Sequence, residues 1–64
     1  MEHKVKYAEL TRGDEFIIDG EAWVTKAVDM PGNGRLVIWA VDPKGKYHTM
    51  EQDMGDEAVV PIYG

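Results

Sequence analysis

The chain has 64 residues, no cysteine, and twelve carboxylates against seven Lys and Arg, which gives a net charge of −5. This length predicts a single domain, residues 1–64, with little surplus for the walls of a catalytic cleft, so an enzyme is disfavoured. The lack of cysteine excludes a disulfide scaffold and a thiolate zinc site, and the scattered, outnumbered basic residues disfavour direct nucleic-acid binding.

The start of the chain, Met1 to Lys4, leads into polar sequence and lacks the apolar core of a secretory signal. No apolar run approaches the roughly 20 residues that a membrane-spanning helix needs. We therefore expect a complete, cytoplasmic protein that makes no contact with a membrane.

Three Pro and seven Gly divide the sequence into short runs rich in β-branched and aromatic residues, which is typical of an all-β domain. In residues 3–10, Val5 and Tyr7 alternate with lysines and favour a strand, whereas Ala8 to Leu10 also fit a helical turn. The following Thr-Arg-Gly-Asp segment, residues 11–14, predicts a turn. Its Arg-Gly-Asp tripeptide is interpreted as turn chemistry and not as an integrin motif.

Residues 15–18 and 21–30 predict two strands joined by Asp19-Gly20. An Asp-Gly pair between apolar runs signals a type I′ hairpin turn, because both central residues need a positive φ. The apolar residues of the second strand depart from strict alternation: Trp23, Val24, Ala27 and Val28. This departure predicts a bulge or a change of buried face.

The Pro-Gly-Asn-Gly segment, residues 31–34, is the longest turn cluster, and it precedes a strand at residues 35–42 that is apolar on both faces. Such a run is best placed as the central strand. Because Ile38 and Trp39 point to opposite sides of this strand, we expect one in the core and the other partly exposed.

After a tight turn at residues 43–45, residues 46–51 predict a fourth strand and residues 52–57 an acidic loop with room for a short 3₁₀ turn. Residues 58–63 predict the last strand. Pro61 has no amide hydrogen for a ladder, so this strand should lie at an edge or kink there. The sequence as a whole predicts five short antiparallel strands that form a small, partly open barrel.

The segment from Leu10 to Val24 resembles the opening of small SH3-like barrels, as found in KOW-type domains and the N-terminal domain of elongation factor P. There too a Gly-Asp turn precedes the first hairpin, and an Asp-Gly turn precedes a strand with aromatic residues and Val. The resemblance implies an SH3-like five-stranded barrel. It does not imply a ribosomal function, because residues 30–34 carry no Lys or Arg in place of the basic tip loop. The size and acidity also look like those of small bacteriophage accessory proteins, which implies the host cytoplasm.

Aromatic residues are the first candidate contacts, because SH3-like and Tudor-like barrels grip peptides or methylated cations with exposed rings. The alternative is that the rings fill the core of a small barrel. Trp39 lies in a run where one face must look outward. We take three aromatic residues as candidates for binding a partner: Trp39, Trp23 and Tyr47.

Acidic residues gather near the C-terminus, and we add four of them to the candidate binding site: Glu51, Asp53, Asp56 and Glu57. Their order does not fit a calcium-binding EF-hand loop, so they are interpreted as a solvated loop or as a docking surface for a basic partner. His48 has no nucleophile on its own face of the strand, and residues 32–34 precede no helix, so neither a catalytic pair nor a phosphate-binding loop is predicted.

These observations favour a protein-interaction module that binds a host or sister protein through an aromatic-bearing face, without a cofactor or metal. The alternative is a homo-oligomeric structural component, in which residues 36–41 or 58–63 are buried between copies. An acidic mimic of nucleic acid that inhibits a DNA-binding enzyme is a third hypothesis, although a net charge of −5 is modest for it.

Overall fold

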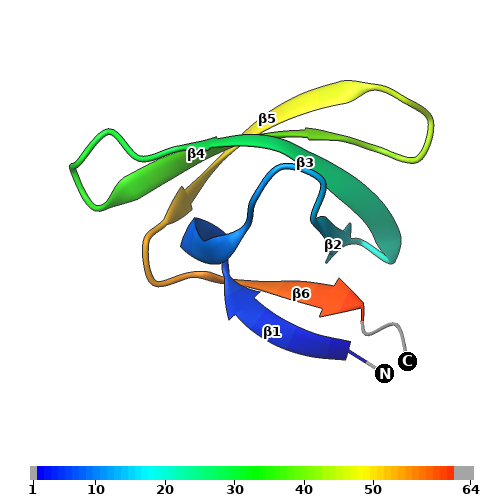
Figure 1. Ribbon diagram of the computed structural model, residues 1–64, viewed down its shortest axis with the longest axis horizontal. Coiled ribbons are helices and arrows are strands. Elements are labelled where there is room, and N and C mark those ends of the chain that lie inside the picture. Colours follow the sequence, from blue (N-terminus) through cyan, green and yellow to red (C-terminus); the bar gives the residue numbers. More distant parts are fainter. Residues whose placement is uncertain (1, 62–64) are drawn as a thin grey trace.

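The computed structural model describes residues 2–61 and contains six antiparallel strands in one sheet, in the order β1-β6-β2-β3-β4-β5 (Figure 1). A 3₁₀ turn, η1 (Tyr7–Glu9), follows the first strand and is the only helical segment of the described residues. The strands are β1 (Glu2–Lys6), β2 (Glu15–Ile18), β3 (Glu21–Asp29), β4 (Arg35–Val41), β5 (Tyr47–Asp53) and β6 (Glu57–Pro61). The all-β class is therefore confirmed.

The prediction of a five-stranded barrel is wrong, because the sheet has six strands and stays open. The additional strand is β1, so residues 3–10 contain both a strand and a helical turn. β1 pairs with β6 from Glu2↔Pro61 to Lys6↔Glu57, whereas β6 pairs with β2 only at Ile17↔Val59. Since β1 and β5 do not pair with each other, each forms an edge of the sheet.

The C-terminal third also differs from its prediction. β5 extends to Asp53, and a tight turn replaces the expected 3₁₀ segment: Asp56 N donates to Asp53 O, and Asp53 N donates to Asp56 Oδ2, each at 3.0 Å. β6 is not an edge strand, because it lies between β1 and β2. Pro61 is its last residue, where a missing ladder donor costs least. Residues 62 and 63 of the predicted strand lie outside the described residues.

The Asp19-Gly20 hairpin is confirmed. Asp19 has a φ of 49° and Gly20 a φ of 80°, and Ile18 pairs directly with Glu21 across the two-residue loop. Positive φ at both central residues is the type I′ geometry that the Asp-Gly pair predicts. The predicted irregularity in β3 is a register shift against β4 between Thr25 and Ala27.

The core lies inside the curved sheet, between β3–β4–β5 on one side and β1–β6 on the other (Figure 1). Eight hydrophobic residues are buried: Tyr7, Leu10, Phe16, Leu36, Ile38, Ala40, Ala58 and Val60. The 3₁₀ turn brings Tyr7 against Phe16 in an edge-to-face contact, with ring centroids 5.7 Å apart. Burial, and then the nearby Asp56 carboxylate, raises the pKa of Tyr7 above its usual value.

Candidate functional site

The outer face of β3, β4 and β5 carries an apolar surface that is turned away from the core. Strand pairing defines it: Trp39 lies opposite Ala27 on one side and Thr49 on the other, and Val41 lies between Val24 and Tyr47. Opposite residues of neighbouring strands share a face. We call this surface the outer face and define it by seven residues: Val24, Ala27, Val37, Trp39, Val41, Tyr47 and Thr49.

Two aromatic side chains stand out on the outer face. Trp39 is 37% exposed and Tyr47 is 69% exposed, whereas Ile38 on the opposite side of β4 is fully buried. The expectation that one residue of the pair Ile38 and Trp39 is core and the other partly exposed is therefore confirmed. Two of the candidate contact residues lie together on one accessible surface.

Trp23 lies on the inner side of the sheet and not with Trp39 and Tyr47. It pairs with the buried Phe16, and its ring stacks on His48 with centroids 4.3 Å apart and an interplanar angle of 22°. Its Nε1 is buried and has no hydrogen-bond partner within residues 2–61. The sequence contained part of the signal for this placement, since a two-residue Asp19-Gly20 loop fixes the Phe16↔Trp23 pair and so puts both rings on one face.

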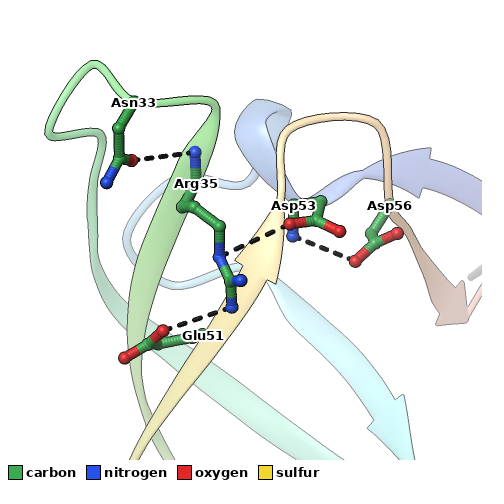
Figure 2. A network of polar contacts seen from close by, with 5 residues as sticks. All are labelled: Asn33, Arg35, Glu51, Asp53 and Asp56. Atoms are coloured by element: carbon green, nitrogen blue, oxygen red, sulfur yellow. Dashed lines mark hydrogen bonds and ion pairs between the residues drawn. The ribbon is translucent and has the colours of Figure 1, made fainter.

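A polar network borders the outer face where β4 begins and β5 ends (Figure 2). Arg35 Nη2 lies 3.2 Å from Glu51 Oε2, and Arg35 Nε lies 3.4 Å from Asp53 Oδ1. The Arg35 amide donates to Asn33 Oδ1 at 3.1 Å. All three charged side chains are about half exposed or more, so each pair stabilises the fold by roughly 0–1 kcal/mol.

The four candidate acids thus separate into two groups. Glu51 and Asp53 share the single guanidinium of Arg35, which sequence reasoning did not place at the site. Asp56 shapes the turn after β5 through its bond to the Asp53 amide, and Glu57 begins β6 opposite Lys6. Only Glu51 and Asp53 therefore lie beside the outer face.

The turn between β4 and β5 is built around one carboxylate that sequence reasoning also missed. Asp42 Oδ1 accepts the amides of Lys44 and Lys46 at 2.9 Å each, and Asp42 Oδ2 lies 2.8 Å from His48 Nε2. The hydrogen bond to His48, followed by that from the Lys46 amide, holds the pKa of Asp42 below its usual value. The signal was an Asp immediately before a Pro-Lys-Gly turn.

An open cleft of about 410 Å³ lies at the other side of the molecule, where β1 and β6 meet the segment before β2. Its lining includes apolar Val5, Leu10 and Val60, and acidic Glu9, Asp14 and Glu15. Two of these acids bond locally: Glu9 Oε1 accepts the Lys6 amide at 3.3 Å, and Asp14 Oδ2 accepts both Thr11 N and Oγ1. Their placement is thus explained by turn structure.

Within the described part of the chain, no three or more His, Asp or Glu side chains are grouped as a metal site. Residues 2–61 also contain no helix that is long and apolar enough to cross a membrane. No protein-family model matches the sequence, and no curated protein is detectably similar to it.

Proposed function

We propose that this domain is an interaction module that binds a host or sister protein through the outer face, with Trp39 and Tyr47 as its anchors. The observation that carries the proposal is the position of Trp39. It lies in the middle of three paired strands, between Ala27 and Thr49, and leaves more than a third of its surface in contact with water. The core is complete without it.

Binding energy at protein interfaces is concentrated in a few aromatic and Arg side chains with a polar rim around them. The outer face has this arrangement. Trp39 and Tyr47 are the aromatic residues, three valines provide apolar surface beside them, and Arg35 with Glu51 and Asp53 provides a charged border. The border favours a partner with basic groups, because two carboxylates share one guanidinium.

Trp23 has a supporting role in this proposal. Its ring packs between Phe16 and His48 on the inner side of the sheet, and Asp42 fixes His48. The stack therefore holds the hairpin that carries Tyr47. A substitution of Trp23 is expected to act through the stability of the fold and not through a contact with the partner.

The test immobilises variants of this domain and compares the proteins that each variant captures from a lysate of the source cell. Wild type and Trp39→Ala are immobilised side by side with Met54→Ala as a matched control. Met54 is 38% exposed, close to the 37% of Trp39, but lies in the turn after β5. Mass spectrometry should identify a protein that wild type and the control retain and that Trp39→Ala loses.

The identified partner is then titrated directly against wild type and the variants. We expect Trp39→Ala to weaken its affinity about tenfold or more, since truncating an aromatic anchor costs roughly 2 kcal/mol or more. A folded Trp39→Ala variant with wild-type affinity would disprove the role of the outer face.

A further inference from the structure

The two edges of the sheet expose backbone groups that have no strand partner within residues 2–61. β5 pairs with β4 over all of its seven residues without a bulge or a proline, so its other side forms a regular edge. At β1, the Lys6 amide donates to Glu9, and the residues before it have no neighbouring strand on that side within the described chain. An edge with unpaired backbone groups is a template for a strand of another chain.

The two edges carry opposite charges on the same side of the sheet. On β1, Val5 pairs with the buried Ala58 and faces inward, so Lys4 and Lys6 face outward. On β5, Glu51 and Asp53 face outward, because they alternate with the partly buried Met50 and Gln52. Neither lysine forms an ion pair within the described residues, although Lys6 lies opposite Glu57 on β6. Glu51 and Asp53 have one guanidinium between them.

We propose that copies of this chain associate head to tail, with the β1 edge of one copy against the β5 edge of the next. Lys4 and Lys6 are two residues apart, as are Glu51 and Asp53. Outward-facing side chains repeat with a period of two, so the two pairs meet whether the added strand runs parallel or antiparallel. Opposite charges across neighbouring strands stabilise their pairing, and like charges destabilise it.

Charge also selects this contact over a symmetric one. Two β1 edges would bring four lysines together with only the two Glu57 carboxylates beside them. Two β5 edges would bring four carboxylates together with only two guanidinium groups. A head-to-tail contact produces open chains with one free edge at each end, or a closed ring with no free edge. This inference goes beyond the proposed function and does not rest on it, because it uses strand edges and only this chain.

The test uses two charge-reversed proteins, Lys4→Glu/Lys6→Glu and Glu51→Lys/Asp53→Lys, in sedimentation velocity at about 0.05 M salt over a range of concentrations. Wild type should show concentration-dependent assembly. Each variant alone should assemble at least about tenfold more weakly, since two attractive contacts become repulsive. An equimolar mixture should restore assembly, because each acidic β1 edge then meets a basic β5 edge.

Charge-matched controls separate the edges from general charge effects. Lys44→Glu/Lys46→Glu places the same change in the β4–β5 turn, and Glu21→Lys/Asp29→Lys places it on the interior strand β3. A mixture of these two control proteins should not assemble better than wild type, because neither control changes the charge of a sheet edge. Thermal unfolding confirms that each variant is folded, and Glu51→Gln/Asp53→Asn replaces the acidic-edge variant if the lysines prevent folding.

Three results would overturn the inference. Wild type could remain monomeric up to about millimolar concentration. The Lys4→Glu/Lys6→Glu protein could assemble like wild type, which would indicate a symmetric contact between β5 edges or between outer faces. The reversed proteins could also fail to assemble when they are mixed although both are folded.

Discussion

Both faces of β4 carry apolar residues, but the two faces have different structural roles. Leu36, Ile38 and Ala40 are fully buried, whereas Val37 and Val41 are half-buried and Trp39 is exposed. The largest side chain of the strand is thus on the accessible side. Leu36, Ile38 and Ala40 fill the core without the Trp39 ring, so the ring is accessible for the contact that we propose.

The strongest test of this comparison is truncation on each face. Ile38→Ala should destabilise the fold by about 3 kcal/mol or more, because it removes buried methylene groups and leaves a cavity. Trp39→Ala should cost less than Ile38→Ala, because the partly exposed ring leaves no enclosed cavity behind. Urea unfolding of both variants measures the difference. Equal losses would show that β4 is buried on both sides.

The next test leaves both faces of β4 unchanged and alters the hairpin that aligns β2 with β3. Gly20→Val should cost about 1 kcal/mol or more, since a β-branched residue resists a φ of 80°. Gly55→Val is the matched control, because a Cβ there also meets open space and the backbone is not left-handed. The urea midpoint should fall for Gly20→Val only.

A smaller, pH-dependent effect on the stability of the fold is expected from Asp42, which directly follows Val41 at the end of β4. Its pKa in the folded protein is lowered from 3.8, first by the bond to His48 and then by backbone amides. The stabilisation is therefore complete above about pH 4 and is lost as the pH falls through the lowered pKa.

The measurement compares melting temperatures of wild type and Asp42→Asn between pH 6 and pH 2. The gap between the two proteins should be constant near neutral pH and should narrow below the usual pKa of 3.8. A gap that is independent of pH down to pH 2 would contradict the assigned role of the carboxylate.

The smallest effect on stability is expected from neutralising the acids beside the outer face, Glu51→Gln/Asp53→Asn, because exposed ion pairs contribute little. Binding of the partner should respond more. The affinity loss should be larger at low salt than at high salt, since exposed charges are screened within about 10 Å at 0.1 M. Trp39→Ala should weaken binding at both salt concentrations. If the neutral variant binds like wild type at low salt, the acids serve solubility alone.

Local signals were sufficient for the parts of the fold that depend on neighbouring residues. The Asp19-Gly20 turn, the irregular β3 and the opposed pair Ile38 and Trp39 could all be predicted from short segments. Which of that pair is core depends on pairing with β3 and β5, so periodicity alone did not decide it. Tertiary pairing also decided the open edges, because the sequence of β6 does not specify that β1 covers it.

The candidate site was predictable to the same extent. Trp39 and Tyr47 lie together because a tight turn aligns β4 with β5, and that turn is visible in the sequence. The hairpin register puts Trp23 on the same face as Phe16, but the short apolar run of β2 does not indicate which of its faces is buried. The pairing of Arg35 with Glu51 and Asp53 depends on two strand registers and a side-chain conformation, for which the sequence offers no direct signal.

The pairing of β1 with β6 has a consequence for the order in which the molecule assembles. β2 to β5 join consecutive strands through short turns, so this meander forms from contacts between nearby residues. β1 precedes the meander, but within residues 2–61 it pairs only with β6, which follows the meander. In the same residues, β6 joins the meander through the single pair Ile17↔Val59. Closing so long a loop is slow. During synthesis β1 must therefore wait until β2 to β6 have been made. Amide hydrogens of β1 and β6 should exchange with solvent sooner than those of β3 and β4.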